Sequence, residues 1–411
     1  MLLPTIFSPL LMNPSSKGQP ALSGVKVLAL EVSVSGPHCT RILGDMGAEV
    51  VKIEKPKEGD LIRHWDSAVR GLSSGYVWLN YNKRSLALDV KKPAGLEILK
   101  RLAKTIDVFV ENFAPGVAAR LGLGYEDLRA INPRLIYCSI SGYGQGGPYK
   151  DVKAYDLLIQ GEAGIIATTG SESQPAKVSV PIADLACSMY AVTGILTALY
   201  QRERTGRGQY IDISMFESIL AWQGYFLQHY WHQGEEPPRV GFRHHYVTPY
   251  GPFLAGDGVY VSFAVATRQD WEVFCLEVID RPELLEDSRF ETSELRRRNR
   301  AALEKMVEEI FLQRGHEEWL ARLEKSRLPY GEVRNIGQVA AHPQVAARQM
   351  VREVDSPVGR IPVTSSPLRL SDSAARFDPI PALGENTKSI LNELGYSEDA
   401  IQLLRAEKVI E

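Results

Sequence analysis

The chain has 411 residues, and with 44% hydrophobic and 24% charged residues it has the composition of a soluble protein with a sizeable core. Its formal net charge is −3 and it has no strongly basic block, which argues against a general nucleic-acid-binding role. A chain of this length predicts two domains or one large, elaborated domain.

Two apolar segments of the chain have some features of a targeting or membrane segment. Residues 1–20 lack a basic region and contain Pro4 and Pro9, so they predict a loose N-terminal arm rather than a signal peptide. The uncharged run 185–201 is slightly short for a membrane span of roughly 20 residues and is interrupted by polar residues, so it predicts a buried helix. Neither segment therefore predicts a membrane partner.

The first half of the chain alternates between strand and helix patterns. Helical patterns at 39–47 and 94–106 separate strand-like runs, and this alternation indicates βαβ units and an α/β fold with a parallel sheet. The strand-like runs are 25–30, 48–54, 84–90, 107–112 and 134–141. In such sheets ligands bind beyond the carboxyl ends of the strands. The loops in which a site is expected are therefore 31–37, 55–63, 112–120 and 142–155.

The pattern changes at about residue 210. The stretch 235–242 contains adjacent prolines and indicates a loop, and 248–266 predicts a hairpin that turns at 256–258. Apolar residues at helical spacing within 303–311 indicate a helix that faces a core. The tail after residue 383 predicts two further helices.

Asp184 stands at the head of a long apolar stretch that contains no further charge until Arg202. One interpretation is a helix N-cap, whose carboxylate accepts hydrogen bonds from the free amides of the first turn. The other is a nucleophile whose anion is favoured at the helix N-terminus. The two interpretations are compatible, and local spacing alone favours the cap.

Several common kinds of site are disfavoured because their motifs are missing. The four cysteines lie far apart without a C-x-x-C pair, which disfavours a zinc or redox site and fits reduced thiols in the cytoplasm. The loop after the first predicted strand lacks the G-x-G-x-x-G pattern of nicotinamide sites, and the glycine-rich stretch 142–149 lacks the G-K-[ST] ending of an ATP site. The stretch IDISMFES at 211–218 lacks the G-x-S-x-G turn of many hydrolases. No metal is expected at His229 and His232 or at His244 and His245, because no acid-rich motif accompanies them.

Separated motifs together resemble one enzyme family. They are SGPHCTRILGDMGAEVVKIEKPKEGD at 35–60, NYNKRSLALDVKKPAG at 80–95, VENFAPGVAARLGLGYEDLRAINPRLIYCSISGYGQGGPY at 110–149, ERTGRGQYIDISMFES at 203–218 and LGENTKSIL at 383–391. From about Leu22 to its C-terminus the chain resembles the class III coenzyme A transferases, which include formyl-CoA transferase and carnitine CoA-transferase.

The resemblance implies a Rossmann-like, doubly wound parallel sheet in a large CoA-binding domain over 21–209. A linker over 210–235 and a smaller α+β domain over 236–335 would follow. A return segment over 336–411 would complete the large domain. Members of the family form interlocked dimers, so the resemblance also implies a homodimer.

The resemblance identifies Asp184 as the catalytic aspartate. Its carboxylate would attack the donor thioester to form an anhydride, and the released CoA would convert that anhydride into an aspartyl-CoA thioester. The acceptor acid would then repeat these steps in reverse. Coenzyme A and acyl-CoA would be substrates, and no permanently bound cofactor is implied.

The resemblance also implies a set of CoA contacts, in which cationic side chains suit the anionic phosphates. The positions are Val34 and Ser35 in the loop beside CoA, Lys55 and Arg120 near phosphates, Leu88 and Lys91 at the adenine side, Asn112, Phe113 and Ala114 at the pantetheine, and Lys153, Tyr155 and Asp156 at the thiol end.

The chain departs from the formyl-CoA transferases in two places. Those enzymes have a glutamine where this chain has Val34, and they have a long glycine-rich loop where this chain has 243–253. Oxalate and formate are therefore not the expected substrates. Arg243, His244 and His245 instead predict contact with the second carboxylate of a C4 or C5 dicarboxylate such as mesaconate, succinate, itaconate or malate.

Other functions on the same fold are also compatible with parts of the sequence. The 2-methylacyl-CoA racemases resemble this chain but have a histidine base where it has Tyr155, whose ordinary pKa of roughly 10 makes it a poor base near neutrality. A CoA lyase or hydrolase would follow if water reached the anhydride. A non-catalytic CoA-binding protein is a further alternative, against which the presence of Asp184 argues.

Overall fold

The computed structural model describes residues 18–411. The predicted N-terminal arm over 1–20 therefore lies outside the described residues apart from 18–20. The described chain forms two compact units, the first from 18–163, 179–222 and 346–411 and the second from 164–178 and 223–345.

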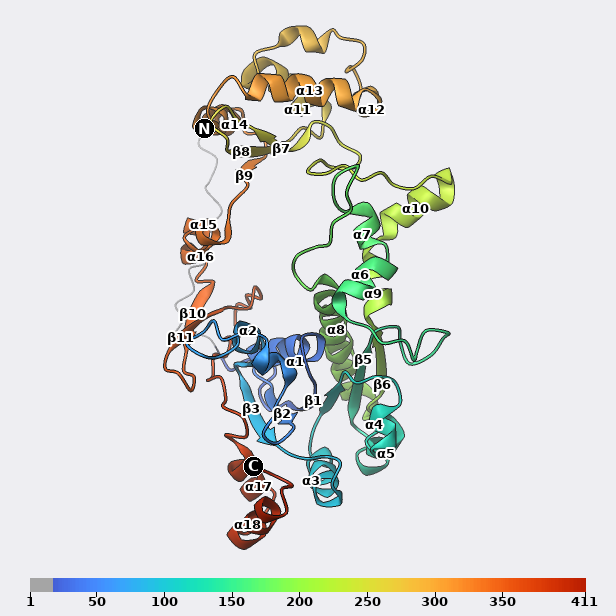
Figure 1. The fold of residues 1–411 in the computed structure, drawn as a ribbon, viewed down its shortest axis with the longest axis vertical. Helices are drawn as coiled ribbons and strands as arrows, with labels where there is room; N and C mark the ends of the chain where they lie inside the picture. Colours follow the sequence, from blue (N-terminus) through green and yellow to red (C-terminus); the bar gives the residue numbers. More distant parts are fainter. Residues whose placement is uncertain (1–17) are drawn as a thin grey trace. The chain divides into compact units, whose positions relative to one another are not determined.

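A parallel sheet of six strands organises the first unit (Figure 1). Its strands are β1 (Lys26–Leu30), β2 (Glu49–Glu54), β3 (Lys83–Ala87), β4 (Val108–Glu111), β5 (Ile136–Ser141) and β6 (Tyr210–Ser214). They lie in the order β3-β2-β1-β4-β5-β6, so the chain starts in the middle and builds outward in both directions. The loops after β1 and β4 consequently diverge at one point, where doubly wound sheets bind their ligands. The predicted α/β fold class is confirmed.

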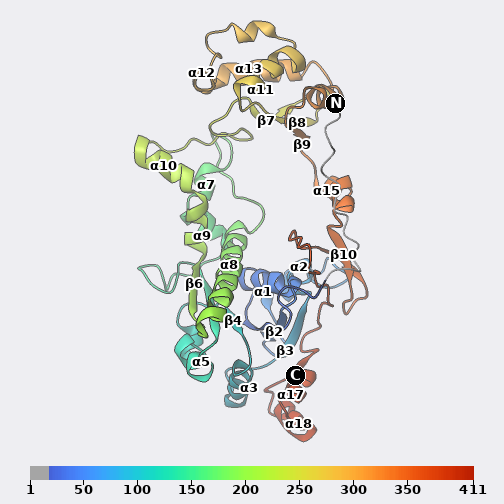
Figure 2. The ribbon, with the colours of Figure 1, turned by 180° about the vertical axis from the view of Figure 1, so that it is seen from behind.

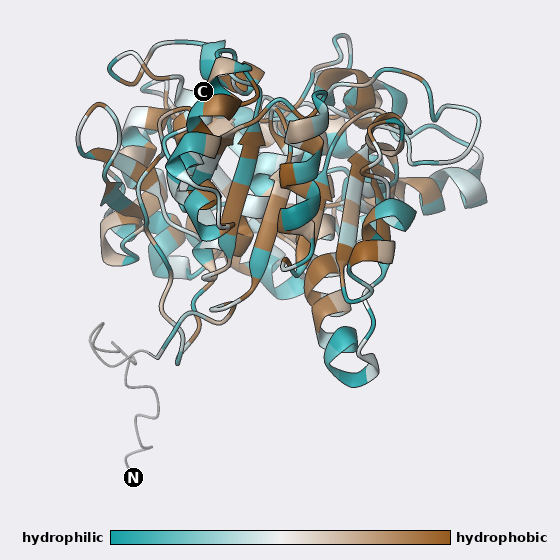
Figure 3. Ribbon diagram, turned by 90° about the horizontal axis from the view of Figure 1, so that it is seen from below, coloured by the Kyte–Doolittle hydropathy of each residue, from teal (hydrophilic) through white to brown (hydrophobic). Residues whose placement is uncertain are grey.

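The sequence of β1 explains its central position. Val27, Leu28, Ala29 and Leu30 are all buried, as expected for a strand covered on both faces. Leu28 and Leu30 belong to a core cluster that also contains residues of the helices on one face. Helices α1 (Ser35–Asp45) and α8 (Ile182–Thr205) cover the other face and lie side by side in Figures 1 and 2. The hydropathy colouring shows apolar strands between these helices (Figure 3).

The helices of the first unit connect and cover these strands. They are α1 (Ser35–Asp45), α2 (Ser74–Asn80), α3 (Pro93–Ala103), α4 (Val117–Arg120), α5 (Tyr125–Ile131), α6 (Asp156–Glu162), α8 (Ile182–Thr205), α9 (Met215–Trp222), α17 (Thr387–Glu393) and α18 (Glu398–Ala406), with the 3-10 turn η2 (Leu61–His64). The return segment also forms an antiparallel pair, β10 (Val351–Val354) and β11 (Ile361–Thr364). Leu88 bridges to Ile410, which ties the end of the chain to the residue after β3.

α8 is the long helix that carries Asp184. By length and apolar composition alone it could cross a membrane, but core helices of soluble proteins meet the same criterion. Ala186, Ala191, Ile195 and Ala198 are buried, and their small or apolar side chains let the helix pack against α1, β5 and β6. Gly206 ends the helix in a left-handed conformation, which glycine adopts readily.

The second unit has a three-stranded antiparallel sheet in the order β7-β8-β9 with helices packed on it. Its elements are α7 (Ile165–Thr168), α10 (Gly224–Gln233), β7 (Tyr250–Leu254), β8 (Tyr260–Ala264), α11 (Arg268–Val273), the π-helical turn η3 (Phe274–Val278), the 3-10 turn η4 (Pro282–Leu285), α12 (Ser293–Arg298), α13 (Arg300–Phe311), α14 (His316–Ser326), β9 (Tyr330–Glu332) and α15 (Ile336–Ala340), followed by α16 (Pro343–Ala347) near the boundary. Stacked aromatic rings, among them Phe263, Phe311 and Trp319, form its core.

The borders of the two units differ from the predicted ones. The sequence predicts a linker over 210–235, but these residues form β6, α9 and α10. β6 was missed because it is an edge strand with polar side chains toward solvent, so it lacks a continuous apolar run. Residues 164–178 cluster with the second unit although the prediction places them in the large domain.

Candidate active site

Asp184 lies in the first turn of α8, opposite the start of α1. Its carboxyl group is partly buried, and burial together with the neighbouring Asp156 carboxylate raises the pKa of Asp184 to about 7. The hydroxyl and the backbone amide of Ser35 act as hydrogen-bond donors to Asp184 and favour its ionised form. The result is a carboxyl group that is about half ionised at neutral pH and poorly solvated, and its anion is suited to nucleophilic attack.

Asp184 is not the N-cap of its helix. The helix begins after Pro181, which makes no side-chain cap, and Asp184 is its third residue. The capping oxygen comes from Asp156 at the start of α6, whose Oδ1 accepts a hydrogen bond from the Ala183 amide at 2.8 Å. The cap interpretation of Asp184 is therefore wrong in this structure, and the Asp184 carboxylate is left available for other contacts.

The loop between β1 and α1 brings Ser35 to Asp184. Asn112, which follows β4, holds this loop by both its polar atoms: Oδ1 accepts from the Val32 amide at 2.9 Å, and Nδ2 donates to the Val32 carbonyl at 2.8 Å and the Ser35 hydroxyl at 3.1 Å. Gly36 leaves the space that Asn112 needs, since a Cβ on it would lie 3.2 Å from Asn112 Cγ. Two loops that diverge from adjacent strands are thus joined beside Asp184.

One turn further along both helices, His38 on α1 meets Ser188 on α8. His38 Nδ1 lies 2.6 Å from Ser188 Oγ, and the Ser188 hydroxyl also donates to the Leu185 carbonyl at 2.8 Å. Burial, with a smaller contribution from Arg41, lowers the pKa of His38 to about 3, so the imidazole is neutral at physiological pH. The contact fixes α1 against α8 beside the Ser35–Asp184 pair. This contact was missed from the sequence, because its only sign there is that His38 and Ser188 each follow Ser35 and Asp184 by one helical turn.

A buried cluster of charged side chains lies beneath the same loop and was also missed. Glu31 receives hydrogen bonds from Thr40 and an ion pair from Lys83 at 2.7 Å, and Lys52 joins Glu31 to Asp60. All these side chains are buried. The signal in the sequence was Lys52, a lysine in the middle of an otherwise apolar strand run.

The predicted basic contacts follow the carboxyl ends of four neighbouring strands. Lys55, Lys91, Arg120 and Lys153 come after β2, β3, β4 and β5, and all four residues are exposed. Lys55 forms only a surface ion pair, with Glu58 at 2.5 Å. Parallel strands place these cations along one edge of the sheet, the edge to which Asp184 and Ser35 also belong.

The other predicted contacts divide into buried and accessible side chains. Val34 packs in a core with Ile62 and Tyr76, and Leu88 is also buried, so only their backbone atoms remain for a ligand. Phe113 packs partly against the core, whereas Ala114 and Tyr155 are exposed. Their roles as CoA contacts stay predictions.

The three residues predicted to bind a second carboxylate lie in the second unit. Arg243 lies over the Phe253 ring and pairs with Glu308 at 2.7 Å and Glu304 at 3.6 Å. His244 Nδ1 accepts from two backbone amides of its own loop, and its ring stacks on a tyrosine at 4.9 Å. Burial lowers the pKa of His245, whose Nε2 is buried without a hydrogen-bond partner in the described structure. Arg243 and His244 thus already have internal partners.

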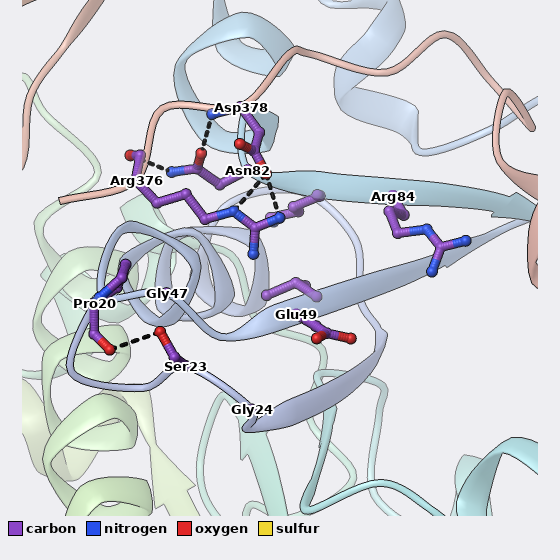
Figure 4. Close-up of a pocket in the computed structure, with 11 residues that line it drawn as sticks. Pro20, Ser23, Gly24, Gly47, Glu49, Asn82, Arg84, Arg376 and Asp378 are labelled. Atoms are coloured by element: carbon purple, nitrogen blue, oxygen red, sulfur yellow. Dashed lines mark hydrogen bonds and ion pairs between the residues drawn. The ribbon is translucent and has the colours of Figure 1, made fainter. Parts of the chain in front are cut away.

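The amino-terminal edge of the sheet carries a separate pocket of about 450 Å³ (Figure 4). Its walls come from the starts of β2 and β3 and from the return segment, where Arg376 pairs with Asp378 and Asn82 bonds to the backbone of both. None of the predicted site residues lines it. Among the described residues, no group of histidine, cysteine, aspartate and glutamate side chains forms a metal site.

Comparison with known proteins agrees with this geometry. A sequence model described as CoA-transferase family III matches residues 22–387. The chain is 39% identical over 397 residues to succinyl-CoA:glutarate CoA-transferase of Homo sapiens, covering 95% of this chain and 90% of that protein. It is 33% identical to succinyl-CoA–D-citramalate CoA-transferase of Chloroflexus aurantiacus, covering 95% of this chain and 98% of that protein.

A solved structure shows the same fold. The crystal structure of a CAIB/BAIF family protein from Brucella suis has a TM-score of 0.80 and 36% sequence identity, covering 92% of this chain and 100% of that one. With a family match across most of its length and relatives of this similarity, the chain belongs to CoA-transferase family III and is a CoA-transferase, as its motifs predict.

Proposed function

We propose that this enzyme moves coenzyme A from an acyl-CoA thioester to a C4 or C5 dicarboxylic acid through covalent intermediates on Asp184. The observation that carries the proposal is the Asp184 carboxylate itself, which is partly buried, faced by two donors of Ser35 and freed from helix capping by Asp156. The names of the relatives above, which include glutarate and D-citramalate, support a dicarboxylate acceptor.

The proposed chemistry needs four exchanges at carbonyl carbons. An Asp184 oxygen attacks the donor thioester carbonyl, the carbon–sulfur bond breaks, and CoA leaves as its thiolate. The thiolate attacks the aspartyl carbonyl of the resulting anhydride and releases the donor acid. The acceptor carboxylate then attacks the aspartyl carbonyl of that thioester, which breaks the carbon–sulfur bond, releases the CoA thiolate and leaves an acceptor–aspartyl anhydride. The thiolate finally attacks the acceptor carbonyl of this anhydride, which forms the acceptor's CoA thioester and regenerates the Asp184 carboxylate. The donors on Ser35 are placed to stabilise the negative charge that develops at the aspartyl oxygen.

The remaining site residues have proposed binding roles. Lys55 and Arg120 would hold the phosphates of CoA, Lys91 would lie at its adenine side and Lys153 at its thiol end. No resident cofactor is part of the proposal. Arg243, His244 and His245 remain proposed contacts for the distal carboxylate of the acid.

The direct test is the intact mass of the purified protein after incubation with succinyl-CoA or glutaryl-CoA and quenching with hydroxylamine or borohydride. We expect the wild-type protein to show a hydroxamate or a reduced side chain at Asp184, because both reagents act on the activated aspartyl carbonyl. The Asp184→Ala variant should show neither. The thioester that reacts identifies the donor.

Two other outcomes would reject the proposal. Exchange of the alpha proton of a 2-methylacyl-CoA in deuterated water, without any adduct, would indicate racemase chemistry in which Asp184 is a base. CoA binding without adduct or turnover on any thioester would indicate a non-catalytic CoA-binding protein.

The pKa of Asp184 predicts the pH dependence of the reaction. Only the ionised carboxylate is a nucleophile, so kcat/KM should rise with pH and level off above a midpoint of about 7. In Asp156→Asn the neighbouring negative charge is lost while an amide oxygen can still accept from Ala183, so the midpoint should move to lower pH. Measuring kcat/KM between about pH 5 and pH 9 tests both points. A midpoint that is unchanged or higher in Asp156→Asn would contradict this interpretation.

We also propose that the enzyme is a homodimer located in the cytoplasm. Met189, Tyr190 and Tyr200 on α8 and Trp222 on α9 are large side chains that stay 38% to 62% exposed in the single chain. Exposed apolar side chains in this number on neighbouring helices are typical of a surface that a partner covers. All four cysteines are free and buried, which fits a reducing compartment. Sedimentation velocity would report a monomer if the dimer proposal is wrong.

A further inference from the structure

The loop that carries Ser35 to Asp184 passes through an unfavourable backbone conformation. Ser33 has φ of +65°, in the left-handed region that residues other than glycine rarely adopt. Such a conformation persists only where the surroundings hold it in place, and it is often found at functional sites. Ser33 is two residues before Ser35, so its backbone angles set the direction of both Ser35 donors.

Asp60 holds Ser33 in this conformation. Its Oδ1 accepts a hydrogen bond from the Ser33 amide at 2.9 Å and from the Ile62 amide at 3.1 Å. Its Oδ2 accepts from Lys52 Nζ at 2.8 Å, and Lys52 Nζ also lies 3.3 Å from the Glu31 carbonyl oxygen. Asp60 and Lys52 are both buried. Together they contact the loop at two points, Lys52 at the Glu31 carbonyl and Asp60 at the Ser33 amide.

We propose that Asp60, oriented by Lys52, is a positioning residue for the reaction: it fixes the left-handed conformation of Ser33 and thereby directs the hydroxyl and amide of Ser35 at Asp184. The inference rests on the proposed role of Asp184 as nucleophile. Asn112 holds the residue before Ser33 and the hydroxyl of Ser35, but it makes no hydrogen bond to Ser33 itself, which leaves the Ser33 amide to Asp60.

A positioning role for Asp60 has a chemical consequence that a purely structural role would not have. The Ser35 donors lower the pKa of Asp184 against the effect of burial. If Ser33 relaxes to a right-handed conformation, these donors turn away and the pKa of Asp184 rises. The pH midpoint of kcat/KM should then move upward, a change that loss of global stability alone would not produce.

The first experiment compares two double variants that both lack the charges of Lys52 and Asp60. In Lys52→Met with Asp60→Asn, the amide oxygen can still accept from Ser33, whereas in Lys52→Met with Asp60→Ala nothing replaces that acceptor. We expect the asparagine variant to keep kcat within about 3-fold of wild type and its pH midpoint unchanged. The alanine variant should lose about 10- to 100-fold in kcat, with KM for acyl-CoA nearly unchanged and a higher midpoint. Adding Ser33→Gly to the alanine variant should restore part of the loss, because glycine adopts the left-handed conformation without a tether.

A second comparison leaves the buried pair intact in case its loss prevents folding. Ser33 is partly exposed, so Ser33→Val and Ser33→Gly should both fold. Valine is strongly disfavoured at positive φ, so Ser33→Val should lower kcat at least about 10-fold and raise the pH midpoint, whereas Ser33→Gly should behave like wild type. Equal kcat and midpoints in the alanine and asparagine variants, or in Ser33→Val and wild type, would overturn the inference.

The outcome also distinguishes this inference from the proposed function. If wild type forms no adduct on Asp184 and Asp184→Ala turns over normally, the proposed function itself fails. If wild type forms the adduct and the Asp60 and Ser33 variants form it at the wild-type rate and pH midpoint, only the positioning role of Asp60 fails.

Discussion

Asp184→Asn is expected to lower turnover by at least about 10⁴-fold while CoA still binds, because the amide keeps the shape of the side chain but cannot attack a thioester. Turnover of succinyl-CoA with a panel of dicarboxylates, together with the Kd for CoA from calorimetry, measures the two effects separately. Asp156→Asn is the matched control, since it neutralises the adjacent carboxylate and should keep most of the turnover at pH 8. Turnover in Asp184→Asn within about 10-fold of wild type would exclude the covalent route.

The same variant should be more stable than wild type at alkaline pH. The folded-state pKa of Asp184 lies above its ordinary value, so the folded protein favours the protonated form and becomes less stable as pH rises toward that pKa. Asp184→Asn removes this effect. Its melting temperature should therefore exceed that of wild type by more at pH 8 than at pH 5, and a gap that narrows as pH rises would contradict the assignment.

Glu31→Gln is expected to cause a large loss of stability. Glu31 is fully buried and neutralises Lys83 at 2.7 Å and, more weakly, Lys52 at 3.4 Å. The substitution leaves two buried ammonium groups with the Asp60 carboxylate alone, and breaking such a buried pair costs about 3–5 kcal/mol of unfolding free energy. Urea unfolding followed by circular dichroism measures the loss in the transition of the sheet-containing unit.

Two variants control this measurement. Glu97→Gln breaks an exposed pair with Arg101 on α3 and should change the unfolding free energy by less than about 0.5 kcal/mol. Adding Lys83→Met to Glu31→Gln removes one unpaired ammonium and should recover part of the stability. A loss below about 1 kcal/mol in Glu31→Gln would show that the cluster contributes little.

The sheet was predictable because its central strands are covered on both faces. The runs 25–30 and 107–112 are mostly apolar, so they can be recognised as strands from local sequence alone, and the structure forms β1 and β4 there. β6 was missed, since an edge strand with Asp212 in its middle gives no such run. The family and the enzyme class were also predictable, because the motifs are spread over most of the chain.

Only those parts of the candidate site that follow from the type of residue at a position could be predicted, and those that follow from tertiary contacts could not. Asp184 was found from its position before an apolar stretch, but its helix is capped by Asp156, which lies 27 residues before the Ala183 amide that it binds, and no local pattern reveals such a contact. Lys52 stands out in the sequence as a charge within an apolar strand run, but nothing in the sequence shows that it pairs with Asp60. Their roles follow from tertiary contacts that a linear pattern does not contain.

The way Asn112 joins two diverging loops has a consequence for the newly made chain. The Val32–Asn112 contact spans 80 residues and the His38–Ser188 contact spans 150, so the site is complete only after β4 has joined β1 and α8 has packed on α1. Contacts between such distant residues form late, since a long loop must close first. A nascent chain whose α8 is still in the ribosomal tunnel has the loops after β1 and β4 but lacks Asp184, the proposed nucleophile, at its place beside Ser35. The proposed acyl-aspartyl bond could then form only after the sheet has assembled.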